Sequence, residues 1–109
     1  MPLDLEALGE RVRSYSARYS AMEIRWSLGP ISSFPEKRAV FAYFEGSGWI
    51  ADIGVWTTGE SELGAKRQVD GLDVNKHYEL PDVLAIDAVL EELLALISEG
   101  TIPLGAHLP

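Results

Sequence analysis

The 109-residue sequence contains no cysteine, which excludes disulfide bonds and thiolate metal sites. It also lacks an apolar run near the roughly 18 to 20 residues that a membrane-spanning helix needs. The most apolar region, 83–97, is interrupted by Asp87, Glu91 and Glu92. The N-terminus, MPLDLEALGER, has no basic start followed by an apolar block, so it does not read as a signal peptide. We therefore expect a cytoplasmic protein.

Basic side chains are few and unevenly placed. Nine Lys and Arg stand against 17 Asp and Glu, which gives a formal charge of −8, and all nine lie at or before Lys76. Nucleic-acid binding needs clustered Lys and Arg that displace counterions from phosphates, so the charge argues against that class of partner. An acidic balance is typical either of solubility alone or of a protein that binds a basic protein partner. The composition leaves both readings open.

Catalytic motifs are also missing. The sequence contains no nucleophile elbow, phosphate-binding loop or HExxH pattern. His77 and His107 are far apart, and neither has the spacing of a metal ligand set. Glu60 and Glu62 share one face of a predicted strand, as two catalytic carboxylates could, but nothing nearby indicates a sugar-binding cleft. We expect a protein that is not an enzyme and that needs no cofactor or metal.

Helical spacing is found towards both ends of the chain. In 5–22, apolar residues recur at steps of three and four after Asp4, a residue that can cap a helix, which predicts a helix over about 5–21. A broader apolar face in 83–97 predicts a second helix over about 82–99, which Gly100 can end in the left-handed conformation. The segment 101–109 contains two prolines, and we expect it to lie extended over the surface.

Between the helices, apolar and polar residues alternate with the period of two that marks half-buried strands. The first strand is expected in MEIRWSL (22–28), and GPISSFPEK (29–37) is expected to be a loop. Four more strands are expected over 38–44, 48–56, 60–69 and 76–80, joined by glycine-containing turns. The predicted fold is one α+β domain over 1–109. It is an antiparallel meander of about five strands, within about 23–80, flanked by an N-terminal and a C-terminal helix.

The turn after the third strand decides which residues share a face of the sheet. A three-residue loop at 57–59, with Gly59 in the left-handed position, places Trp56 opposite Glu60. A two-residue loop would exchange the faces of the fourth strand and mix its apolar residues with polar ones. The sequence therefore predicts the three-residue loop.

Across EGSG (45–48), the same reasoning pairs Phe44 with Trp49 and Ala42 with Ala51. The expected inner face, covered by a helix, consists of Val40, Ala42, Phe44, Trp49, Ala51, Ile53, Val55, Leu63 and Ala65. The expected outer face carries Phe41, Tyr43, Ile50, Asp52, Gly54, Trp56, Glu60, Glu62 and Lys66. Aromatic groups beside carboxylates are typical of protein interfaces. The alternatives are that the C-terminal helix covers Trp56 and that the glutamates are ordinary solvated charges near a turn.

The stretch VWTTGESEL (55–63), followed after a hairpin by HYEL (77–80) and a leucine-rich acidic helix, resembles the TriTu family of bacterial immunity proteins. The resemblance covers about half of the chain, from Gly48 to Ile97. The matching positions are Trp56, Thr58 (often serine in the family), Gly59, Glu60, Leu63, Tyr78 and Glu79. The N-terminal helix and the 29–37 loop carry none of it.

The resemblance implies a protein that binds and neutralises a cognate polymorphic toxin. The family name associates it with ADP-ribosyltransferase toxins that modify the translation factor EF-Tu, so that the toxin, not this chain, would bind NAD. We take Trp56, Glu60, Glu62, Asp52 and Tyr43 as candidate partner-binding residues, with the acidic C-terminal helix as the next candidate surface. The alternatives are a chaperone or adaptor for a secreted protein and a homo-oligomeric structural module with the outer face as its self-interface.

Overall fold

The computed structural model describes residues 2–32 and 37–109, so residues 33–36 of the expected 29–37 loop lie outside the described residues. One antiparallel sheet has the strand order β1-β2-β3-β4-β5. Its strands are β1 (Arg25–Leu28), β2 (Ala39–Gly46), β3 (Trp49–Trp56), β4 (Glu60–Arg67) and β5 (Asp73–Glu79). The helices are α1 (Leu5–Arg13), α2 (Ser16–Ala21) and α3 (Ile86–Glu99), the last preceded by the 3₁₀ turn η1 (Val83–Ala85). The predicted α+β meander between helices is confirmed.

The N-terminal helical segment is divided, where one helix over 5–21 was predicted. Tyr15 has φ −89° and ψ 2°, outside the helical region, and separates α1 from α2. The local hydrogen bonds explain the break, because the Val12 carbonyl accepts from the Tyr15 N–H at 3.3 Å and from the Tyr19 hydroxyl at 2.9 Å. The Ser14 hydroxyl also donates to the Arg11 carbonyl at 2.6 Å. The apolar stripe is continuous across the break, so spacing alone could not reveal it.

The register between β2 and β3 differs from the predicted one by two residues. Gly46 pairs with Trp49 and Phe44 pairs with Ala51, where Phe44 had been expected opposite Trp49. The physical reason is a two-residue turn in which Ser47 (φ 48°) and Gly48 (φ 82°) are both left-handed, the conformation of the hairpin turn that matches strand twist. A shift of two leaves each side chain on its predicted face.

The predicted register between β3 and β4 is confirmed. Ile53 pairs with Leu63 and Ala51 with Ala65, and Gly59 has φ +98° in the connecting loop. All nine predicted inner-face residues are buried, none more than 7% exposed. The glycine is also needed for space, because a Cβ at position 59 would lie 2.8 Å from the Leu80 carbonyl oxygen.

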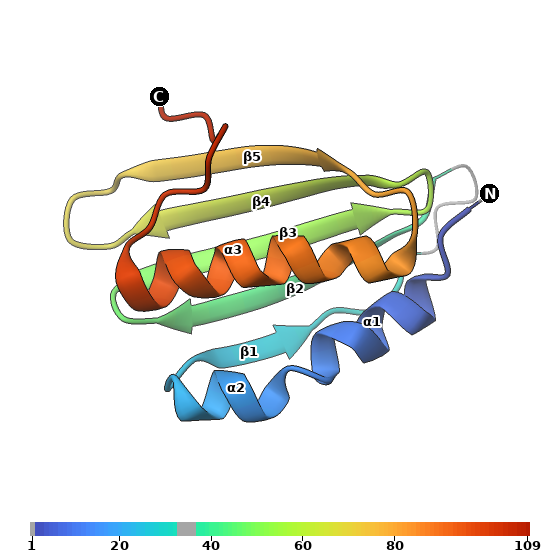
Figure 1. The fold of residues 1–109 in the computed structure, drawn as a ribbon, viewed down its shortest axis with the longest axis horizontal. Coiled ribbons are helices and arrows are strands. Elements are labelled where there is room, and N and C mark those ends of the chain that lie inside the picture. Colours follow the sequence, from blue (N-terminus) through green and yellow to red (C-terminus); the bar gives the residue numbers. More distant parts are fainter. Residues whose placement is uncertain (1, 33–36) are drawn as a thin grey trace.

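All the helices lie on one side of the sheet (Figure 1). Buried residues of α1, α2 and α3 form a single core with the inner face. On β5, Lys76 and Tyr78 point to the inner side of the sheet, and both donate hydrogen bonds to Glu92 of α3. Helix α3 therefore covers the inner face and not the outer one. After Gly100 the chain returns to the far edge of the sheet, where the His107 N–H donates to the Asn75 carbonyl at 2.6 Å. The tail therefore shields one position of the β5 edge.

The two left-handed glycines give a matched test of the turns. Gly48→Ala should cost about 1–2 kcal/mol of unfolding free energy, because an alanine in this conformation is strained although nothing lies within 4 Å of its Cβ. Gly59→Ala should cost more, because the same strain is joined by the clash with Leu80. Ser47→Asn should be neutral or stabilising, since asparagine is preferred in this turn. Urea unfolding measures all three. Equal losses at Gly48 and Gly59 would contradict the assigned geometry.

Candidate protein-binding face of the sheet

The outer face is arranged as four rows that cross the strands. Besides the predicted residues, it includes Arg25, Ser27, Glu45, Asp73, Asn75, His77 and Glu79. The row nearest the β3–β4 turn runs through Ala39, Trp56, Glu60 and Glu79. The next rows run Phe41–Gly54–Glu62–His77, then Ser27–Tyr43–Asp52–Gly64–Asn75, then Arg25–Glu45–Ile50–Lys66–Asp73. All five candidate binding residues therefore lie on one face.

Trp56 forms the centre of an aromatic group at the turn end. Its ring packs edge-on against Phe41, with ring centroids 5.5 Å apart. The absence of a side chain on Gly54 makes room for this pair, since a Cβ there would lie 2.5 Å from Phe41 Cε2. Lys37 Nζ lies 5.7 Å from the Trp56 ring centroid and 2.6 Å from Glu60 Oε2. Trp56 is thus half-buried by neighbours of its own face, without cover from a helix.

Three exposed side chains, Glu62, His77 and Glu79, are in contact beside this aromatic group. His77 Nδ1 lies 2.5 Å from Glu62 Oε1, and its Nε2 lies 3.4 Å from Glu79 Oε2. The contact with Glu62, followed by that with Glu79, raises the pKa of the histidine above its usual 6.5. Glu60 differs, because the hydrogen bond from Lys37 lowers the pKa of its carboxyl. One imidazole therefore serves two carboxylates here, whereas Glu60 has a lysine.

A shallow depression of about 650 Å³ occupies the middle of the outer face. It forms because Gly64 has no side chain, while Tyr43, Ile50 and Lys66 stand around it. Tyr43 and Ile50 expose 49% and 47% of their surface. Such exposure is unusual for large side chains in strands whose other face is buried in the core. Its rim carries two internal ion pairs, Arg25–Glu45 and Lys66–Asp73.

Asp52 is the one carboxylate in this depression without a basic partner among residues 2–32 and 37–109. It leans over Gly64, where an added Cβ would lie 2.9 Å from its Oδ1. Partial burial is the sole cause that raises the pKa of Asp52. Its carboxylate is therefore desolvated without compensation from the protein, in contrast to the paired acids of the rim.

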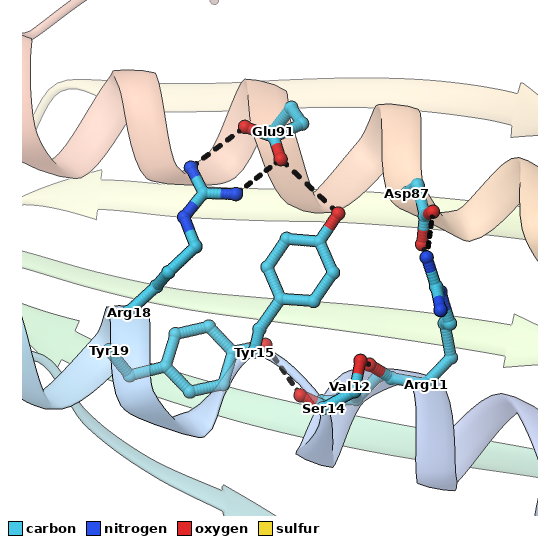
Figure 2. Close-up of polar contacts among 8 residues, drawn as sticks. All are labelled: Arg11, Val12, Ser14, Tyr15, Arg18, Tyr19, Asp87 and Glu91. Carbon is cyan, nitrogen blue, oxygen red and sulfur yellow. Dashed lines mark hydrogen bonds and ion pairs between the residues drawn. The ribbon is translucent and has the colours of Figure 1, made fainter.

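The acidic α3 helix, the second candidate surface, is much less available. Arg11 holds Asp87 with two hydrogen bonds of 2.6 and 2.7 Å (Figure 2). Arg18 holds Glu91, which also accepts from the Tyr15 hydroxyl at 3.2 Å (Figure 2). The third acid of the interrupted apolar run, Glu92, binds Lys76 at 2.6 Å. Much of the negative charge of α3 is thus neutralised within the fold.

The sequence placed Trp56, Glu60, Glu62, Asp52 and Tyr43 on one face, as the structure does, but did not show which of them are neighbours. Trp56, Glu60 and Glu62 lie in the two rows at the turn end, while Tyr43 and Asp52 are direct cross-strand neighbours in the depression. The depression itself was missed. An interior glycine in a strand, as at Gly64, was the signal that could have indicated it.

No protein-family model, curated protein or solved structure matches this chain significantly. The resemblance to TriTu proteins stays a prediction based on the residues quoted above. In the part of the chain that the structure describes, no group of three or more His, Asp or Glu side chains could hold a metal ion. Within the same ranges, no helix has the length and apolar character needed to cross a bilayer.

The His77 contacts predict a measurable titration. By NMR, His77 should titrate above 6.5, and Glu62→Gln should lower its pKa more than Glu79→Gln, because Glu62 makes the shorter hydrogen bond. The raised pKa means that the protonated imidazole adds stability below pH 6.5, which is lost as pH rises through the folded-state pKa. Glu6→Gln, at an exposed position of α1, is the control. A His77 pKa insensitive to Glu62→Gln would contradict the contact.

Proposed function

We propose that this chain is an immunity protein that binds and neutralises a cognate bacterial toxin in the cytoplasm, as a stoichiometric inhibitor and not as an enzyme. The observation that carries the proposal is the open outer face, which presents an aromatic pair and two exposed large side chains, Tyr43 and Ile50. It also presents carboxylates that have no Lys or Arg partner among residues 2–32 and 37–109. Aromatic residues with a polar surround are characteristic of interfaces.

The charge distribution supports a basic partner. Helix α3 is acidic but largely neutralised by Arg11, Arg18 and Lys76. On the outer face, Asp52 has no ion-pair partner among the described residues, and Glu62 and Glu79 share a single histidine. This uncompensated charge would speed the capture of a basic toxin surface, and burial of Trp56 and Tyr43 would slow release.

Inhibition by such a face is steric. A five-stranded sheet is rigid, so docking it over the entrance of a toxin active site would exclude the substrate without chemistry on either protein. The resemblance to TriTu proteins narrows the partner to an ADP-ribosyltransferase that acts on EF-Tu. In that case the toxin contains the NAD site, and this chain only blocks access to it.

The test is co-expression with the toxin domain that the proposal expects the neighbouring gene to encode. We expect protection of the cells, a 1:1 complex, and loss of toxin activity on adding purified protein. A chaperone or adaptor would instead bind an unfolded or N-terminal segment of its client. A homo-oligomeric structural module would self-associate without any partner, which light scattering on the purified protein would detect. Toxicity that persists, with no complex, would overturn the proposal.

Charge reversal locates the binding face. Glu62→Lys on the outer face should weaken toxin binding at least tenfold. A lysine facing a basic toxin surface introduces like-charge repulsion of several kcal/mol, and roughly 1.4 kcal/mol corresponds to a tenfold change in affinity. Glu10→Lys makes the same change in net charge at an exposed position of α1 and should weaken binding by no more than about threefold, through long-range steering alone. Titration calorimetry measures both. The reverse ranking would place the interface on the helical side.

A further inference from the structure

We infer that the depression on the outer face receives an arginine side chain of the partner, with Asp52 as the group that binds the guanidinium. The inference rests on the proposed function, because the arginine would belong to the toxin. The depression volume of about 650 Å³ falls within the range of roughly 300–1,000 Å³ typical of ligand sites. It is large enough for one long side chain together with part of its backbone.

Charge selects a cation. The rim is neutral, because Arg25 pairs with Glu45 and Lys66 lies 3.7 Å from Asp73. The floor carries the single uncompensated carboxylate of Asp52. A half-buried carboxylate has lost part of its hydration, and this cost is offset only when a hydrogen-bond donor reaches it. A positively charged donor makes the strongest such hydrogen bond.

The surrounding groups favour guanidinium over ammonium. Tyr43 is the direct cross-strand neighbour of Asp52 and is 49% exposed, so its ring is available for a planar cation to stack upon. The depression is lined by both Asp52 and Gly64, so a guanidinium within it can reach the carboxylate, which can accept two parallel hydrogen bonds from arginine. Ile50, 47% exposed, offers an apolar contact for the methylene stem of the arginine.

Lys66 is the rival occupant within the chain itself. It lines the depression, but its ammonium lies near Asp73, and Asp52 has no ion-pair partner among the described residues. If a different rotamer of Lys66 filled the site in solution, added arginine would not bind until Lys66 was removed. The experiment must therefore include a Lys66 variant.

The probe is N-acetyl-arginine-N-methylamide, titrated into the full-length protein by two-dimensional NMR. We expect saturable shifts at millimolar concentration, clustered on the amides around Tyr43, Asp52 and Gly64. The isosteric but uncharged N-acetyl-citrulline-N-methylamide should bind at least about tenfold more weakly, since its hydrogen bonds lack the charge. The lysine analogue should fall between them, because ammonium cannot form the planar bidentate pair.

Asp52→Asn should reduce probe binding at least about tenfold. It should fold as stably as the wild type or more so at pH 7, because burial penalises the charged carboxylate and not the amide. Glu10→Gln, which removes one charge at an exposed position of α1 on the helical side, is the matched control and should leave probe binding unchanged within about twofold. Lys66→Ser should leave binding intact or strengthen it.

Several outcomes would overturn the inference: no saturable shifts, shifts centred on Glu62 and His77, equal binding of the citrulline analogue, or binding seen only after Lys66→Ser. The toxin complex is measured separately, with wild type and Asp52→Asn. A complex unaffected by Asp52→Asn, with no probe binding, would refute the arginine site and leave the proposed function standing. Specific probe binding without any toxin complex would support the site and refute the proposed function.

Discussion

Burial of the sheet on one side only is the constraint on which the rest of this structure depends. The helices α1, α2 and α3 all pack against the inner face of the sheet. Every strand must therefore place alternate residues in the core and the others on the outer face. The strands follow one another in sequence, with short turns between β2, β3, β4 and β5, and the antiparallel pairing keeps this alternation across all five. The outer face is therefore an ordered grid of cross-strand rows, whose composition is free of the demands of the core.

Charge is divided between the two sides of the sheet in a related way. On the helical side, Asp87, Glu91 and Glu92 are each held by a basic residue from another element. These exposed or partly exposed pairs contribute little to stability, because solvent screens them. Their larger effect is to remove free negative charge from α3. On the outer face, in contrast, Asp52, Glu62 and Glu79 have no Lys or Arg partner among the described residues.

The faces of the strands could be predicted from sequence, but the detailed neighbours could not. Alternation survived the register error at the β2–β3 turn because a shift of two residues preserves parity. The error arose because Ser47 adopts a left-handed φ that is uncommon outside glycine and asparagine. The wrong register placed Tyr43 opposite Ile50, whereas in the structure Tyr43 is the cross-strand neighbour of Asp52. The depression depends on this row, and no single-strand pattern contains it.

Two glycines within the strands bear on what the outer face is for. Glycine weakens a strand because it loses more backbone entropy and packs no side chain, yet Gly54 and Gly64 both occupy interior outer-face positions. Gly54 leaves room for the Phe41 ring beside Trp56, and Gly64 leaves room for the carboxylate of Asp52. Asp52 adds a desolvated charge that the fold does not compensate. Three residues that do not favour stability thus shape one aromatic group and one acidic depression, which supports the proposal that this face binds a partner.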